Sequence, residues 1–332
     1  MNERGFLRQV LRRGPSTDPS TGSGQRSGRG AGQAPDGVSA DDRPGDQPHR
    51  GAGTSPRRRL WVTFRSNQTA LVGVIVAVVV VALAISAPWL SPHDPLKQNV
   101  YYRLKGPEPG HPMGVDDFGR EVLSRILWGA RTSLIVGTAS VVVGAMVGTL
   151  MGIVAGFKGG PAEYITMRAV EVLLSFPTLV MGLMAMAVLG SGMLKLILAI
   201  GVVMSPRFAR VAHGPTLSIR EQEYVLAARA VGASDWRILR RHVLPNILGE
   251  VLVMASLWTA TAIRIEANLS FIGLGVPPPT PTWGNMIRDG VKWLTNAPYL
   301  SVFPGLAILI TVLAFNMVGD GLRDMADPKL QV

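Results

Sequence analysis

The chain has 332 residues and a formal net charge of +11, and 47% of its residues are hydrophobic while 17% are charged. It has no cysteine, which excludes disulfides and thiolate-bound metals, and its five histidines are too dispersed to indicate a metal site. A basic balance can indicate nucleic-acid binding. However, the sequence has no zinc-finger, RNA-binding or basic-zipper pattern, whereas it does have apolar runs of bilayer length. We therefore predict a membrane protein that binds lipid and no nucleic acid.

The amino-terminal segment differs in composition from the rest of the chain. Residues 1–65 hold twelve arginines, no lysine and six acidic residues among many Gly, Ser and Pro. Because so little apolar surface cannot offset the entropy lost on ordering, residues 1–56 are predicted to be a disordered tail. Arginines at 57–59 and 65 directly precede the first apolar run, an arrangement typical of a cytoplasmic flank. The amino terminus is therefore predicted to be cytoplasmic and the first helix uncleaved.

Six apolar runs are predicted to cross the bilayer as helices, since about 20 apolar residues span its hydrocarbon core. The fourth run carries Arg207 and Arg210 in its last third, from where long side chains can extend toward the cytoplasmic interface. Pro177 and Pro206 fall within the third and fourth runs and indicate either packing irregularities or gating hinges. The predicted fold class is an all-α polytopic membrane protein with six transmembrane helices, at residues 70–87, 132–157, 172–194, 194–212, 247–266 and 301–319.

Small residues form a stripe along the second run. They recur at strict four-residue intervals, which places them on one helix face: Ser140, Gly144, Gly148, Gly152 and Gly156. Such a stripe allows close backbone approach, either to another helix of this chain or to a partner subunit.

Charged residues within the apolar runs are candidate functional groups. Arg264 and Glu266 lie inside the fifth run, and ionisable groups within a membrane are functional-site hypotheses by default. They are two residues apart, about 200° around a helix, so they cannot share one face. Structural pairing or interfacial placement and contact with a transported solute both remain open. Outside the runs, Glu121 and Arg125 have the spacing of an i,i+4 ion pair.

The polar loop 213–246 separates the fourth and fifth runs. Residues 221–231 favour a helix, and Gly232 supplies the permissive backbone expected at its end. Trp236 and the apolar residues after it predict a second amphipathic helix at the membrane surface, and Pro245 marks the start of the next span.

The order of residues in this loop resembles a known motif. Ala227-Ala228, three further residues, Gly232 and then Leu244-Pro245 resemble the EAA loop of ABC-importer permeases, the coupling helix that docks on the ATPase subunit. The resemblance implies a cytoplasmic coupling helix here. It implies ATPase-coupling roles for Glu223, Tyr224, Ala227, Ala228, Arg229, Gly232, Ala233, Leu244 and Pro245.

Two positions depart from the motif. Leu226 stands where the motif has Glu, and His242 where it has Ile, so the family's roles for those side chains are not carried over.

Three further stretches, residues 113–134, 266–286 and 316–330, resemble the C-type permease subunits of peptide and nickel importers. The match is closest to dipeptide and oligopeptide permeases, and it covers nearly everything from Arg58 onward. It implies the type I ABC-importer permease fold. The predicted domains are the tail 1–56, a first transmembrane helix and the start of an extracytoplasmic segment at 57–112, and a permease core at 113–332.

The resemblance implies a multi-pass subunit of the bacterial cytoplasmic membrane that imports peptides by alternating access, or, alternatively, nickel or metal chelates. Its implied partners are a homologous second permease subunit, two ATPase subunits or domains, and an extracytoplasmic solute-binding protein. The sequence has no phosphate-binding loop and no hydrolase motif, so we predict no catalysis and no cofactor in this chain, with ATP and Mg bound by the ATPases. A secondary transporter and a membrane scaffold or intramembrane enzyme are the competing classes.

Overall fold

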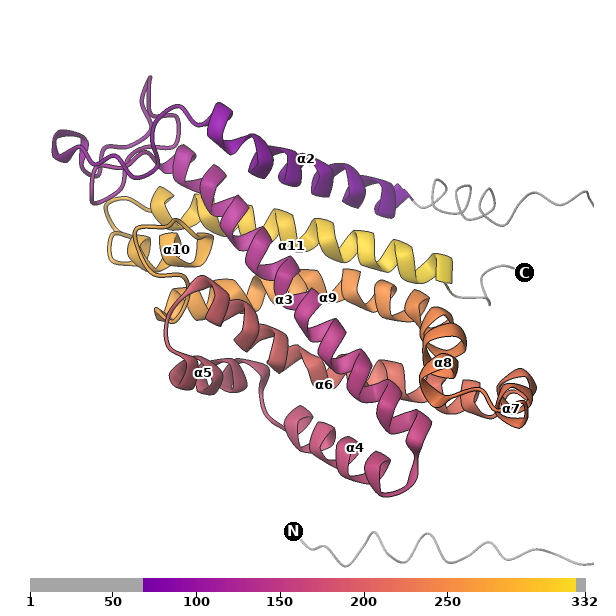
Figure 1. Cartoon of the computed structure of the whole chain (residues 1–332). Coiled ribbons are helices and arrows are strands. Elements are labelled where there is room, and N and C mark those ends of the chain that lie inside the picture. Colours follow the sequence, from indigo (N-terminus) through magenta and orange to yellow (C-terminus); the bar gives the residue numbers. More distant parts are fainter. Residues whose placement is uncertain (1–67, 327–332) are drawn as a thin grey trace, which may run out of the picture. The chain divides into compact units, whose positions relative to one another are not determined.

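The computed structural model describes residues 68–326, whose regular elements are helices (Figure 1). The predicted tail 1–56, the arginines that follow it and residues 327–332 lie outside the described residues. In chain order the helices are α2 (Gln68–Leu90), η1 (Val100–Tyr102), α3 (Val122–Lys158), α4 (Gly160–Ser175), α5 (Thr178–Leu189), α6 (Met193–Arg220), α7 (Glu223–Ala230), α8 (Asp235–Ile238), η2 (Leu239–Val243), α9 (Leu244–Ile272), α10 (Trp283–Val291) and α11 (Tyr299–Ala326).

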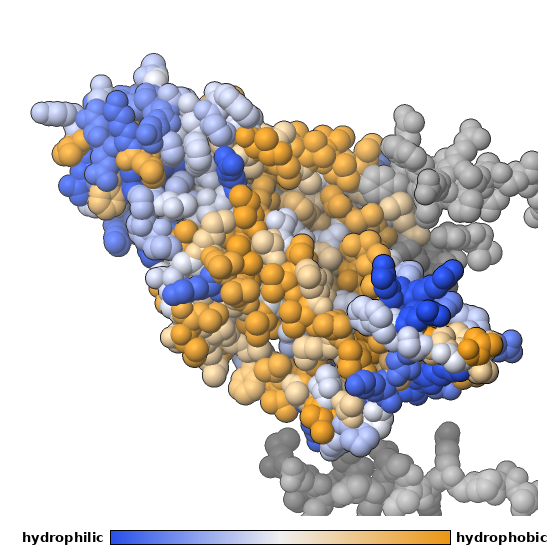
Figure 2. Space-filling view, in the orientation of Figure 1, coloured by the Kyte–Doolittle hydropathy of each residue, from blue (hydrophilic) through white to orange (hydrophobic). Residues whose placement is uncertain are grey.

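Four helical stretches are long and apolar enough to cross a membrane, namely α2, α3, α9 with the short helices before it, and α11. The number rises to five if α4 and α5 form one bent span. The helix that contains the fourth predicted span, α6, is not among them. Large apolar side chains on the qualifying helices are exposed, including Val78, Leu150 and Leu309. Figure 2 shows this apolar surface between polar patches at two ends, as expected of a protein surrounded by lipid.

The two ends of the helices carry different elements (Figure 1). We refer to the end that carries α7 and α8 as the α7 end. The opposite end, which carries α10 and the segment 91–121, is the α10 end.

The small-residue stripe of α3 faces α6 of the same chain. A Cβ added at Gly148 would lie 2.1 Å from the carbonyl oxygen of Ser205, and one added at Gly152 would lie 2.2 Å from that of Ala209. The other two glycines of the stripe face α6 in the same way, each with 3.0 Å from an added Cβ to a backbone oxygen. Because no side chain intervenes, the two backbones meet directly along this face.

The third predicted span, residues 172–194, is not one straight helix. Helix α4 ends at Ser175, α5 begins at Thr178, and the two are bent by 102°. Pro177 cannot donate a backbone hydrogen bond and disfavours helical backbone in the residue before it. Phe176 accordingly has an extended backbone, with φ −81° and ψ 141°. The bend therefore follows from the proline, whereas Pro206 lies inside an unbroken α6.

The segment 91–121 is fastened to the helices at the α10 end. The hydroxyl of Tyr299, at the start of α11, hydrogen-bonds the carbonyl oxygens of Lys105 and Val115 at 2.9 and 3.1 Å. Next to it, Nε1 of Trp283 in α10 donates to the carbonyl oxygen of Ile126 in α3 at 3.1 Å. These bonds join parts of the chain far apart in sequence into one packed end.

Candidate functional site

Helix α7 is held to the rest of the protein by one buried side chain. Val225 is fully buried, the only buried residue of this helix. It belongs to an apolar cluster with residues of α3, α6 and α9, among them Phe157, Ala212 and Ile247. Helix α7 therefore packs directly against a cluster shared by three long helices.

The other side of α7 is open and partly apolar. Leu226 on α7 is 49% exposed, Val231 directly after it is 85% exposed, and Trp236 on the neighbouring α8 is 69% exposed. Two side chains of α7 contact rings elsewhere in the protein. The rings of Tyr224 and His242 lie 5.7 Å apart, and the guanidinium of Arg229 lies 4.7 Å from the ring centre of Phe157. Exposed apolar side chains beside polar ones are typical of a surface that binds another protein.

Gly232 ends α7 with a left-handed backbone. Its φ is +81°, its N–H donates to the carbonyl oxygen of Arg229 at 2.9 Å, and the next N–H, of Ala233, donates to Ala228 at 3.0 Å. An added Cβ would meet no atom within 4 Å, so backbone conformation, not space, requires glycine here.

The second amphipathic helix predicted near Trp236 is not a separate element. Helix α8 continues through the π-helical η2 into α9, so Leu244 and Pro245 lie within one helical run. Pro245 falls in the first turn of α9, and the wider π turn before it accommodates the missing N–H. The loop after α7 is thus mechanically continuous with α9.

Arg264 and Glu266 lie on different sides of α9, as their spacing requires. Arg264 is exposed, whereas Glu266 is fully buried. One carboxylate oxygen of Glu266 accepts a hydrogen bond from Ser270 at 2.7 Å, while the other has no hydrogen-bond partner in the described protein. The carboxylate of Glu266 therefore lies among packed helices, whereas the side chain of Arg264 is exposed on the outside of α9.

Arg207 has partners that the sequence did not indicate. It was expected to extend toward the membrane interface, but it donates to the hydroxyl of Thr178, the first residue of α5, at 2.6 Å. Its guanidinium also lies 4.3 Å from the ring centre of Trp258 on α9. Arg207, Thr178 and Trp258 lie on three different helices, so no local sequence pattern indicates that they meet.

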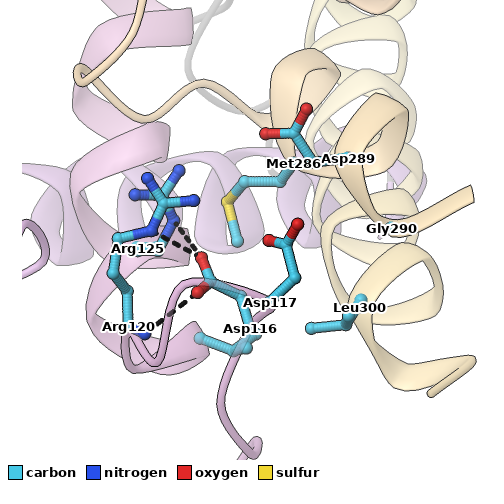
Figure 3. Close-up of a pocket in the computed structure, with 9 residues that line it drawn as sticks. Asp116, Asp117, Arg120, Arg125, Met286, Asp289, Gly290 and Leu300 are labelled. Atoms are coloured by element: carbon cyan, nitrogen blue, oxygen red, sulfur yellow. Dashed lines mark hydrogen bonds and ion pairs between the residues drawn. The ribbon is translucent and has the colours of Figure 1, made fainter. Parts of the chain in front are cut away.

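A charged cluster lies at the α10 end (Figure 3). Asp116 lies 2.7 Å from Nε of Arg120 and 3.4 Å from Nε of Arg125. Beside them, burial, together with repulsion from Asp116, raises the pKa of Asp117. The enclosed cavity has a volume of only about 20 Å³, room for one water molecule. The cluster therefore fastens the segment 91–121 to α3 and is too small to hold a solute.

The predicted ion pair between Glu121 and Arg125 does not form. Glu121 is the N-cap of α3, and its carboxylate accepts the N–H of Ser124. Arg125 instead pairs with Asp116. Capping the free N–H groups of the first turn competes successfully with an i,i+4 pair.

The comparisons with known proteins define the class. Residues 148–332 match the family described as "Binding-protein-dependent transport system inner membrane component", and residues 55–107 match the "N-terminal TM domain of oligopeptide transport permease C". The chain belongs to the first of these families, so it is a multi-pass inner-membrane transport protein of the permease class. The resemblance seen in the sequence is confirmed.

Individual relatives are similar over nearly their whole length. The chain is 41% identical over 278 residues to "Glutathione transport system permease protein GsiD" of Pectobacterium atrosepticum, covering 83% of this chain and 92% of the relative. It is 39% identical over 277 residues to "Dipeptide transport system permease protein DppC" of Alkalihalophilus pseudofirmus, covering 83% and 91%. A solved structure of the MetNI methionine ABC transporter matches with a TM-score of 0.51 at 18% identity, over 61% of this chain and 97% of that chain, and so shares the fold.

Proposed function

We propose that the chain is the membrane-spanning permease subunit of an ATP-driven importer that moves di- or oligopeptides across the cytoplasmic membrane by alternating access. The observation that carries this proposal is α7, whose one buried side chain, Val225, joins the core and which presents exposed apolar side chains at the end of the spans. The printed names of the relatives, a glutathione and a dipeptide permease, support the peptide as solute.

The proposed topology has six spans: α2, α3, the bent pair α4–α5, α6, α9 and α11. The α7 end faces the cytoplasm, together with the amino terminus. Arginines gather at this end and support the orientation through the positive-inside rule: Arg220, Arg229, Arg237, Arg240 and Arg241.

The proposed partners follow from this orientation. Two ATPase subunits or domains bind ATP and Mg and dock on α7, and the coupling surface comprises the loop residues named above from Glu223 to Pro245. Closure of the ATPases moves α7, and the Val225 cluster passes the movement to α6 and α9. A homologous permease subunit completes the pathway, and a solute-binding protein delivers peptide at the α10 end. The family description itself supports a binding protein.

Reconstitution tests the proposal. The complex of this chain with its second permease, ATPases and binding protein is placed in proteoliposomes, and uptake of radiolabelled Ala-Ala is followed. Uptake should require ATP and the binding protein and should survive dissipation of the proton gradient. Uptake that persists without ATP but stops with the gradient would identify a secondary transporter and overturn the proposal.

A further inference from the structure

The bend between α4 and α5 lies halfway between the two ends of the spans. It touches Arg207, which is near the middle of α6, about 21 Å along the axis from the first residue of that helix. It is also level with Trp258, which stands at the middle of α9 and stacks on Arg207. The first turn of α5 therefore lies at mid-depth, where lipid headgroups do not reach.

Three sources of positive charge lie at or near this bend. The first turn of α5 has no side-chain cap, so its free N–H groups carry the positive end of the helix dipole. The guanidinium of Arg207 donates a hydrogen bond to Thr178, the first residue of this turn. The guanidinium of Arg264 is exposed on α9, six residues or about 9 Å along the helix axis beyond Trp258, which stacks on Arg207.

No acidic side chain balances these charges within residues 68–326. Each ion pair in that range involves other arginines or a histidine. The carboxylate of Glu266, two residues from Arg264, is fully buried and bonded to Ser270. Arginines inside a membrane without an acidic partner are costly, and such residues generally mark a substrate or ion pathway.

We propose that Arg207, Arg264 and the first turn of α5 bind a carboxylate of the transported solute. This rests on the proposed function, because it assigns the solute contact within that pathway. Guanidinium groups match the two oxygens of a carboxylate, and the start of a broken membrane helix is suited to an anionic group. Mid-depth excludes a lipid phosphate as the anion. Trp258 and Thr178 position Arg207 for this contact.

Charge-selective labelling tests the site without requiring transport. The chain has no cysteine, so Met181→Cys places a single thiol one turn from Thr178 on the same face of α5 and keeps the hydrogen bond from Arg207 to Thr178. The ratio of its labelling rates with an anionic and a cationic methanethiosulfonate is measured in the assembled transporter. Arg207→Gln and Arg264→Gln should each lower this ratio about tenfold. Arg207→Lys and Arg264→Lys should preserve it, as should Arg131→Gln, which removes an exposed arginine of α3.

Solute protection then identifies the anion. Ala-Ala should slow the labelling of Met181→Cys and Ala-Ala amide should not, and Arg264→Gln should abolish this difference. If both arginine variants leave the ratio unchanged in the complex, the proposal is wrong. It is equally wrong if the ratio responds in the isolated chain but not in the complex, since the second permease subunit then supplies the neutralising carboxylate. Failure of Ala-Ala uptake by the wild-type complex would instead count against the proposed function.

Discussion

A single backbone angle sets the direction in which the chain leaves α7. Gly232 turns the chain from α7 toward α8 with φ +81°, in space that is otherwise open. A side chain at this position would not clash, but it would strain the left-handed backbone by about 1–2 kcal/mol, and more for a β-branched residue. The angle at which α7 projects therefore depends on this residue.

Gly232→Val is expected to reduce ATP-driven peptide uptake at least tenfold while the protein still inserts into the membrane. The strained turn should rotate α7 away from its partner and uncouple ATP hydrolysis from transport. The measurement is uptake and solute-stimulated ATPase activity in proteoliposomes, with insertion checked by membrane fractionation. Gly249→Val is the matched control, because it lies in α9, has no positive φ and meets open space. Normal uptake by Gly232→Val would argue strongly against a coupling role for α7.

Asp117 predicts a pH dependence at the α10 end. Its pKa is raised by burial and by Asp116, so the folded protein holds the proton more tightly than the unfolded chain does. The folded state therefore loses stability as pH rises above the ordinary value of 3.8, and this loss is complete above the raised pKa. Asp117→Asn removes the charge and therefore this loss of stability. Its melting temperature should exceed that of the wild type at neutral pH, and the difference should vanish toward pH 3.

The neighbouring carboxylate provides the contrast. Asp116→Asn breaks contacts with Arg120 and Arg125, so it should lower the melting temperature at neutral pH. A melting temperature for Asp117→Asn that equals the wild type at every pH would contradict the assigned cause.

At the scale of the elements, α3 and α6 pack closely because glycines, which have no side chain, line the contact on α3. Gly148→Ala places a Cβ 2.1 Å from the carbonyl oxygen of Ser205, which forces two helix backbones apart. Overpacking of this kind typically costs about 1–3 kcal/mol. The variant should melt at a lower temperature in detergent. Gly305→Ala in α11, where an added Cβ meets nothing within 4 Å, should melt at or above the wild-type temperature. Equal melting of both variants would show that the stripe is not a close contact.

Elements were predictable from the sequence where their signal is local. Apolar runs indicated α2, α3, α9 and α11, and the spacing of small residues indicated a close-packing face on α3. The proline at 177 marked the place of the bend, but its 102° depends on how α5 packs against α6 and α9. Arg207 and Thr178 are 29 residues apart, so their hydrogen bond exists only because of that packing. Glu121 could locally either pair with Arg125 or cap the start of α3, and in the folded protein it caps the helix.

At the scale of the whole molecule, the two ends differ in what they leave open. The α7 end exposes Val231, at 85%, beside a helix with a single buried side chain. The α10 end exposes Tyr101, at 91%, on a segment that is fastened by Tyr299 and the Asp116 cluster. An exposed, partly apolar helix at one end and a braced surface at the other fit the proposal that the protein receives force from one side and solute from the opposite side.

This division predicts labelling from opposite sides of the membrane. Since the chain contains no cysteine, Val231→Cys and Tyr101→Cys each introduce a single reactive thiol on an exposed side chain. In intact spheroplasts a membrane-impermeant maleimide should modify Tyr101→Cys within minutes and leave Val231→Cys unmodified until the membrane is opened. The wild-type chain, which has no cysteine, is the negative control for labelling. Labelling of Val231→Cys from outside would place α7 away from the cytoplasm, where no ATP-driven subunit can reach it, and the proposed coupling mechanism would then have no physical basis.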